Sequence, residues 1–307
     1  MQKTIKTEAR PAFYTRVRGQ KHLKAPSPLG HQNGVTLIEL MVGIAIGLLV
    51  VAVAMGALMV SRGVSGTVSD ASAIQQQAAY AMRVIGAQIR QAGSLYINMT
   101  YQTNNADPYL AQVAIETSAP ASGTYNAFEP STDTIKGASD SMTIGYRRYK
   151  ETVTNPANPG QDESQSRNCI GGPANNSDDK RLESIFRYNP ATATLSCSGN
   201  DPAASPQPII QNVANFEVRY LLQDNSTQGD SKVKRVLAAG VGADWNKVQG
   251  IEVCLVLYGN EAIDLPSGSK YPDCDGELKD IPQTGERARR MHMVFRNVFQ
   301  LRSQGLT

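Results

Sequence analysis

The feature that most constrains this chain is an uncharged apolar run near its amino terminus. From Leu40 to Val60 there are 21 consecutive residues without a charged side chain, LMVGIAIGLLVVAVAMGALMV. As an α-helix that rises about 1.5 Å per residue, this run spans about 30 Å, which is the thickness of the hydrocarbon core of a bilayer. The run therefore predicts a membrane-spanning or membrane-targeting segment, and the residues around it decide which.

The segment before this run is basic. Residues 1–34 carry seven Lys and Arg side chains against one Glu, a net charge of +6, whereas the rest of the chain carries 23 basic and 26 acidic side chains, a net charge of −3. Positively charged flanks stay on the cytoplasmic side, so this layout is typical of an export or membrane-orienting signal. The mildly acidic remainder has no basic cluster with interleaved aromatic residues, and we expect no nucleic-acid partner.

Glu39 stands directly before the apolar run. An ordinary signal peptide, with a small-residue cleavage site at Ala52 and Ala54, gains nothing from this carboxylate, and neither does a simple transmembrane anchor. A carboxylate at the head of a membrane helix is costly unless it is paired, and such residues are functional candidates by default. Glu39 therefore favours a third interpretation, which depends on the residues around it.

The residues from Gly34 to Leu40, GVTLIEL, resemble the type IV prepilin signature, which is a glycine, a hydrophobic residue and then Thr-Leu-Ile-Glu-Leu. The resemblance implies that a membrane aspartic peptidase cuts between Gly34 and Val35 and that the new amino terminus at Val35 is N-methylated. It also implies that Glu39 faces the charged amino terminus of a neighbouring subunit. At an effective dielectric of about 20, such a pair about 4 Å apart gains roughly 4 kcal/mol before desolvation.

The helical period continues beyond Arg62, with apolar residues at every third or fourth position and Gln and Arg in much of the remainder, including Gln88. This pattern predicts an amphipathic helix with a narrow apolar stripe, and Gly93 fits its carboxyl-terminal end. We expect one helix from about Thr36 to Ala92 that packs on its own globular domain and also meets neighbouring subunits. The stripe comprises Val64, Val68, Ala71, Ile74, Ala78, Met82, Ile85, Ile89 and Ala92.

Strand patterns follow the helix. We assign no strand to residues 94–140, and residues 151–180 and 259–290 read as polar loops. In the last predicted strand, apolar Met and Phe alternate with polar residues such as His292, which predicts one buried face. The expected fold class is α+β, with a long amino-terminal helix packed on an antiparallel sheet. The predicted strands are Ser141–Tyr149, Ser184–Tyr188, Phe216–Leu222, Ile251–Tyr258 and Met291–Leu301.

All four cysteines, Cys169, Cys197, Cys254 and Cys274, lie well beyond the apolar run. An even number on the exported side predicts two disulfides formed in an oxidising compartment, and the residues alone leave three connectivities open. His292 is the only histidine beyond the run, which argues against a zinc site or a histidine-based triad. We expect no metal and no cofactor.

Several segments resemble the PilW-type minor pilins. They are QIRQAG at residues 88–93, the stretches around Cys169 and Cys197, PIIQNV at residues 208–213, and Arg287 followed by Phe295-Arg296-Asn297. The resemblance carries no catalytic residue, so we expect no enzyme. Within it we expect the pairs Cys169–Cys197 and Cys254–Cys274, each closing a loop of a few tens of residues.

Three further candidates favour structural roles. Asp224 to Gly229 begins like a calcium loop, but the twelfth position is Arg235 rather than Glu, so a turn between strands is the better interpretation. Trp245, the single tryptophan, is expected to be a packing residue. The cluster of Arg287, Arg289 and Arg290 is expected to form a solvated face.

The expected domains are a leader at residues 1–34, which is removed, a pilin helix at 35–93 with 35–60 in the membrane, and a β-rich domain at 94–307. The resemblance implies a minor pilin, a structural subunit for type IV pilus assembly or priming. It would lie in the inner membrane with its carboxyl-terminal domain in the periplasm, and afterwards in the filament or at its tip. The implied partners are the prepilin peptidase, other minor and major pilins, the inner-membrane assembly platform and membrane lipid. A minor pseudopilin of a type II secretion system shares this amino terminus, and an exported enzyme or binding protein with an ordinary signal peptide is the alternative from another class.

Overall fold

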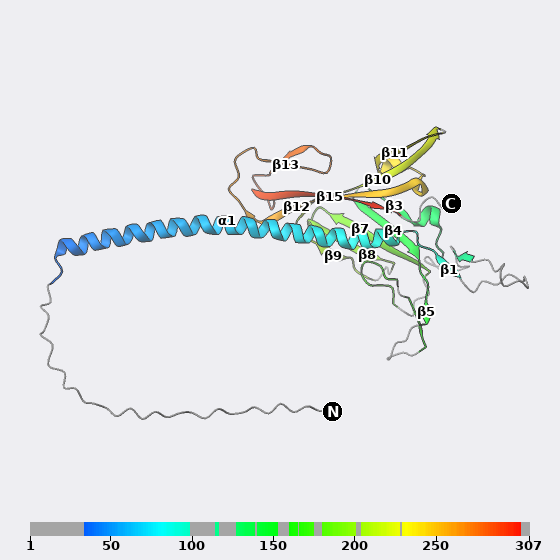
Figure 1. Cartoon of the computed structure of the whole chain (residues 1–307), viewed down its shortest axis with the longest axis horizontal. Coiled ribbons are helices and arrows are strands. Elements are labelled where there is room, and N and C mark those ends of the chain that lie inside the picture. The colour runs from blue at the N-terminus through cyan, green and yellow to red at the C-terminus, as the bar shows by residue number, and fades with distance from the viewer. Residues whose placement is uncertain are drawn as a thin grey trace, which may run out of the picture. The chain divides into compact units, whose positions relative to one another are not determined.

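The computed structural model describes residues 34–98, 114–116, 127–138, 140–152, 160–164, 166–174, 180–200, 204–227 and 229–301. They form one long helix and a set of antiparallel strands (Figure 1). The chain divides into two units, residues 1–56 and residues 57–307. The boundary falls inside the long helix, and each unit is described by itself.

Helix α1 extends from Leu37 to Gln91, which is close to the range expected from the sequence. In the first unit every described residue from Gly34 to Gly56 is exposed, including Leu37, which is 77% exposed. By its length and composition, α1 is able to cross a membrane. Because apolar side chains this exposed are unfavourable in water, this part of the helix requires an apolar environment.

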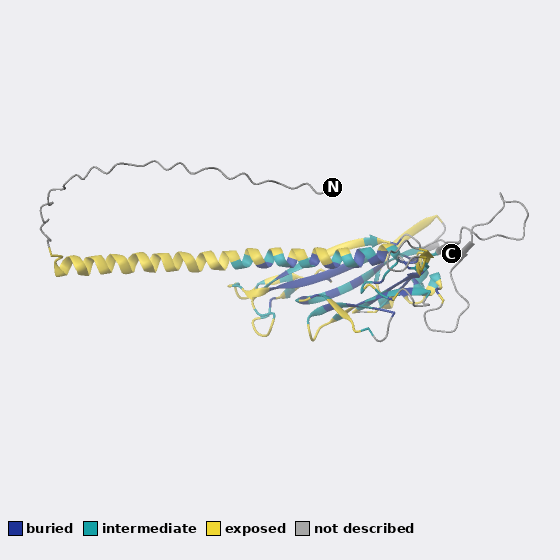
Figure 2. Ribbon diagram, turned by 90° about the horizontal axis from the view of Figure 1, so that it is seen from below, coloured by how far each residue is buried: buried dark blue, intermediate teal, exposed yellow. Residues whose placement is uncertain are grey.

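In the second unit α1 is buried along one side (Figure 2). The buried stripe begins at Asp70 and Ile74, whereas Val64 and Val68, which the sequence places in the stripe, are 60% and 65% exposed. The stripe is therefore shorter than predicted, since the strands cover the helix only from Asp70 onward. The helix ends as predicted at Gly93, which has a φ of 68° and donates its N–H to the carbonyl of Gly145 (2.9 Å).

This unit contains two large antiparallel sheets. The five-stranded sheet has the order β3-β4-β7-β8-β9 and the four-stranded sheet the order β11-β10-β12-β15. The strands of the first are β3 (Ile135–Gly137), β4 (Ser141–Arg147), β7 (Arg181–Asn189), β8 (Thr194–Gly199) and β9 (Gln207–Ile210). Those of the second are β10 (Val213–Thr227), β11 (Asp230–Leu237), β12 (Val248–Ala262) and β15 (Arg290–Gln300).

Short elements complete the described chain. Strand pairs are formed by β1 (Tyr96–Asn98) with β2 (Ala114–Glu116), β5 (Glu151–Thr152) with β6 (Asp162–Glu163), and β13 (Lys270–Pro272) with β14 (Leu278–Asp280). The short helices are α2 (Pro130–Asp133), α3 (Ala238–Val241) and the 3₁₀ turn η2 (Trp245–Lys247).

One hydrophobic core joins the helix to both sheets. Ile85 and Ile89 of α1 are fully buried, and they belong to the same cluster as Phe186 of β7 and Leu255 of β12. On β12, alternate residues such as Val253 and Leu255 enter this core, as the period of two requires. The α+β fold with a long apolar helix packed on antiparallel sheets is thereby confirmed.

All five predicted strands are present, but the sequence missed others. Strand β11 was not predicted because it lies at the edge of its sheet, where nearly every residue is exposed and Lys and Arg replace an apolar alternation. Strand β9 is short and contains Pro208, which a strand tolerates only at an edge. The loops predicted at residues 94–140, 151–180 and 259–290 contain short strands, which are too brief for the sequence to show their period, and the last of these loops also contains the end of β12.

The last strand departs from its predicted pattern. Met293 and Phe295 of β15 do pack against the core, but His292, on the opposite side, is only 8% exposed. Its ring stacks on Tyr271 of β13 with centroids 4.2 Å apart and planes at 16°. The β13–β14 hairpin therefore covers the face that the sequence assigned to solvent.

We expect Ile85→Ala to lower the free energy of unfolding by about 2–5 kcal/mol, because it leaves a cavity between the helix and both sheets. Val68→Ala on the same helix removes an exposed side chain and should change stability by no more than about 0.5 kcal/mol. Denaturant unfolding of the full chain in detergent micelles, followed by the fluorescence of Trp245, measures both. Equal effects of the two substitutions would contradict the assigned packing.

Burial lowers the pKa of His292, and nearby Arg287 lowers it further, although the backbone carbonyl of Arg290 opposes this shift. The unfolded chain takes up this proton near pH 6.5, whereas the folded chain takes it up only at lower pH. The contribution of neutral His292 to stability is thus complete above pH of about 6.5 and is lost as the pH falls below it.

We therefore expect the free energy of unfolding of the wild type to fall relative to that of His292→Phe as the pH falls from about 7.5 to about 5. Phe keeps the stacking on Tyr271 and does not titrate. Denaturation midpoints of the two proteins across this pH range provide the measurement, and a constant difference would refute the assignment.

Candidate assembly site on the long helix

The amino-terminal end of α1 is closed by a capping interaction. The Oγ1 atom of Thr36 accepts a hydrogen bond from the backbone N–H of Glu39 (3.3 Å), and the Thr36 carbonyl accepts one from the N–H of Leu40 (3.1 Å). Thr followed three residues later by Glu is the sequence of a capping box. The motif that carries the family resemblance thus also sets the first residue of the helix.

Glu39 lies in the first turn of α1 and is exposed. Its charge is favoured there by the helix dipole, and it is the only charged residue between Gly34 and Ser61. The neighbouring Val35 and Ile38 are 70% and 71% exposed. The result is a single carboxylate in an exposed apolar surface, which is suited to pairing with a cation in a medium of low dielectric.

Gly34 and Val35 precede the helix and are exposed. A Cβ placed on Gly34 would meet nothing within 4 Å, so the peptide bond between these residues is open on that side. Cleavage and methylation at this position stay predictions.

The structure forms two disulfides, and they are the pairs expected within the resemblance. Cys169 and Cys197 join the segment before β7 to β8, with a sequence separation of 28, and Cys254 and Cys274 join β12 to the turn between β13 and β14, with a separation of 20. The second bond lies in a small buried cluster with Val256. Both bonds lie within the β-rich unit and hold loops to strands.

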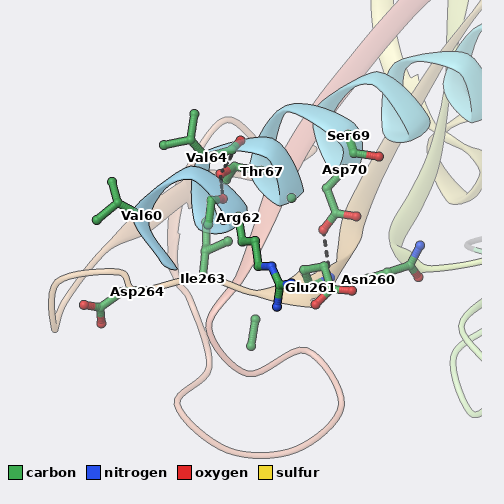
Figure 3. Close-up of a pocket in the computed structure, with 13 residues that line it drawn as sticks. Val60, Arg62, Val64, Thr67, Ser69, Asp70, Asn260, Glu261, Ile263 and Asp264 are labelled. Atoms are coloured by element: carbon green, nitrogen blue, oxygen red, sulfur yellow. Dashed lines mark hydrogen bonds between the residues drawn. The ribbon is translucent and has the colours of Figure 1, made fainter. Parts of the chain in front are cut away.

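Asp70 is a buried carboxylate that the sequence analysis did not single out. It is 6% exposed, and its Oδ2 atom accepts a hydrogen bond from the backbone N–H of Glu261 (2.8 Å; Figure 3). Gly259 permits this contact, since a Cβ there would lie 2.5 Å from the same oxygen. Asp70 therefore ties α1 to the end of β12, where the register with β15 shifts.

Gln88 is the second buried polar residue of the helix, at 7% exposure, although the sequence pattern placed it on the polar side. Its Oε1 atom accepts a hydrogen bond from the Ser184 hydroxyl (2.8 Å) and lies 3.3 Å from the Tyr146 hydroxyl. That hydroxyl donates to the carbonyl of Arg167 (2.6 Å), and burial raises the pKa of Tyr146 well above its ordinary value. Ser184 also accepts the N–H of Cys169 (3.1 Å), which links the helix to a disulfide.

A sequence signal for these residues exists. Asp70 precedes Ile74 by four positions and Gln88 follows Ile85 by three, so both lie on the same face of the helix as the apolar stripe. A polar residue on such a stripe must find a partner in the body that the helix packs against. The identity of the partner is set by strands far away in the sequence.

The arginine cluster is only in part the solvated face that we expected, because Arg289 is exposed and pairs with an exposed carboxylate, whereas Arg287 and Arg290 are half-buried. Arg289 pairs with Asp264 (2.6 Å), and Arg290 donates to the carbonyl of Gly259 (3.2 Å) and lies over the Tyr258 ring. Arg287 donates to the carbonyl of Ala214 (3.3 Å). The guanidinium groups of Arg287 and Arg290 therefore hold the start of β15 and the segment before it to β10 and β12.

The remaining candidates have structural roles. Trp245 packs edge-on against Tyr220, with ring centroids 5.0 Å apart. Asp224 pairs with Lys234 of β11 (2.6 Å) in the β10–β11 hairpin. Within the described ranges, no group of three His, Cys, Asp or Glu residues is placed to hold a metal ion.

We expect Asp70→Ala to lower the free energy of unfolding by about 1–3 kcal/mol, because it removes the acceptor of the Glu261 N–H. Asp70→Asn retains an acceptor oxygen and should cost less, and Ser69→Ala on the exposed side should have almost no effect. Hydrogen exchange of the segment 259–263 tests the contact directly. If this segment exchanges at the wild-type rate in Asp70→Ala, the contact is not made.

Residues 175–303 match the family described as Type IV Pilus-assembly protein W, and residues 29–55 match the Prokaryotic N-terminal methylation motif. No curated protein matches the chain significantly. Among solved structures, a type IV-like pilin from Thermus thermophilus shares 11% identity, with 75% of this chain and 96% of that chain covered and a TM-score of 0.37. The family matches cover the capped start of α1 with Glu39 and most of the two sheets. The chain is a type IV prepilin-like protein whose body is similar to the PilW-type minor pilins.

Proposed function

We propose that this protein is a minor pilin, a structural subunit in type IV pilus assembly or priming, which a prepilin peptidase processes between Gly34 and Val35. The observation that carries the proposal is the placement of Glu39. It is a lone carboxylate in the first turn of an exposed apolar helix, and the helix leads into a PilW-like body.

Before cleavage, the basic leader keeps the amino terminus in the cytoplasm, and α1 anchors the chain in the inner membrane. The β-rich domain then lies in the periplasm. Its two disulfides support this orientation, because such bonds persist in oxidising compartments.

Cleavage removes a segment with a net charge of +6 and creates a charged amine at Val35, which is then N-methylated. This amine is the cation that Glu39 of a neighbouring subunit pairs with. An unpaired carboxylate in an apolar medium is costly, so the pairing favours lateral entry of the subunit in one register.

The partners of this function are the prepilin peptidase, other minor and major pilins and the inner-membrane assembly platform. The proposed role of the protein is structural and involves no catalysis. The PilW match over residues 175–303 favours the pilus over a type II secretion system, in which a minor pseudopilin with the same amino terminus would act. Processing between the same two residues is expected in either system, so the body decides between them.

We expect Glu39→Ala to leave processing intact and to remove the protein from the filament, because the amino terminus of the neighbouring subunit then has no carboxylate to pair with. Amino-terminal sequencing of the membrane fraction should give a start at Val35 for both the variant and the wild type. Immunoblots of sheared filaments should then contain the wild type and lack the variant.

Glu39→Asp, which keeps the charge, is the matched control and should restore part of the incorporation. Normal amounts of Glu39→Ala in sheared filaments would overturn the assigned role. A mature start at Met55 would show an ordinary signal peptide and would overturn the function as a whole.

A further inference from the structure

A cavity of about 860 Å³ lies in the second unit, between the first turns of α1 after the apolar run and the end of β12 (Figure 3). The helix lines one wall from Val60 to Asp70, and the segment Asn260–Asp264 lines the other. Gly63 and Gly66 face open space, since a Cβ on either would meet nothing within 4 Å. The helix backbone is therefore accessible from this cavity.

The lining is amphiphilic. Arg62 lies on the helix wall and Ile263 on the facing wall, whereas the side chains of Val60 and Val64, which are 69% and 60% exposed, point away from the facing wall (Figure 3). The facing wall carries the exposed carboxylate of Glu261. Apolar and charged groups in one cavity fit a ligand that is itself amphiphilic, and a small polar solute would leave Ile263 without an apolar contact.

The two charges that are available to a ligand have opposite signs and lie on opposite walls. Arg62 extends from the helix towards the segment that carries Glu261 (Figure 3), but neither residue forms an ion pair in the part of the chain that the structure describes. Asp264 is engaged by Arg289, and Asp70 accepts the N–H of Glu261. A ligand with one anionic and one cationic group matches Arg62 and Glu261.

The position of Arg62 along the chain narrows the class of ligand further. Arg62 is the first charged residue after Glu39, and it lies two residues beyond the apolar run. When Leu40–Val60 fills the hydrocarbon core, Arg62 falls at the level of the lipid head groups. This step rests on the membrane-anchored state in the proposed function.

We propose that this cavity binds the head group of a zwitterionic aminophospholipid while the protein is in the membrane. The lipid phosphate pairs with Arg62, and the primary ammonium group pairs with Glu261. Ile263 contacts the apolar part of the lipid next to the head group. A lipid held in this way fixes the end of β12 at the membrane surface, next to the contact between Asp70 and the backbone.

The test is a comparison of lipids on the delipidated full chain in detergent micelles, with bound lipid counted by native mass spectrometry. We expect a phosphatidylethanolamine to bind about tenfold more tightly than the phosphatidylcholine with the same acyl chains, whose quaternary ammonium cannot donate hydrogen bonds. Phosphatidylglycerol, which lacks the amine, should bind as weakly as phosphatidylcholine or more weakly.

Glu261→Gln should remove the preference for phosphatidylethanolamine, and Arg62→Gln should weaken the binding of all three lipids. Glu277→Gln, at an exposed position between β13 and β14, is the matched control and should keep the wild-type preference. Equal binding of the three lipids by the wild type overturns the proposal, and so does an unchanged preference in Glu261→Gln. Either of these two outcomes would be expected if the cavity contacted another subunit and not a lipid.

Binding in micelles requires neither cleavage nor a filament. A failure of this proposal therefore leaves the Glu39 experiment intact, and a failure of the Glu39 experiment does not alter the lipid comparison.

Discussion

The burial of one face of α1 against two sheets is the constraint on which the rest of this structure depends. The inner faces of the five-stranded and the four-stranded sheet meet the helix in one cluster, to which α1 contributes residues such as Ile85 and Ile89. Neither sheet has another helix of comparable length to cover it within the described residues. Loss of this stripe would expose apolar faces of both sheets together, so the helix is part of the core and not an attachment to it.

The sequence of the helix changes along its length. Up to Gly56 all described side chains are exposed and almost all are apolar, whereas from Asp70 the buried side alternates with Gln and Arg. An apolar stripe alone tolerates small rotations and slips of a helix. Asp70 and Gln88 limit that freedom, because each needs one specific hydrogen-bond partner and an unpaired polar group in the core is costly. The two lie 18 residues apart, about 27 Å along the axis.

Much of this could be predicted from the sequence, and the failures have physical causes. The apolar run, the helix to Gly93 and the five long strands carry strong periodic signals. Strand β11 lies at a sheet edge, where no buried face imposes a pattern. His292 appeared solvated because its cover, the β13–β14 hairpin, comes from a segment without a readable period. Glu39 was found because its neighbours form a motif, whereas Asp70 has no motif and depends on the backbone of Glu261, 191 positions away.

The stretch between Val60 and Asp70 has little packing support from the rest of the second unit. Its residues are exposed or half-buried, Gly63 and Gly66 weaken the helix, and the Thr67 hydroxyl donates to the carbonyl of Gly63 (2.7 Å). Because these turns bury little side-chain surface, we expect them to open at a lower free energy than the buried turns that follow. Asp70 is the first buried residue of α1, and its hydrogen bond to the Glu261 N–H opposes the spread of local unwinding beyond it. These turns can thus bend or open without disturbing the core of the body.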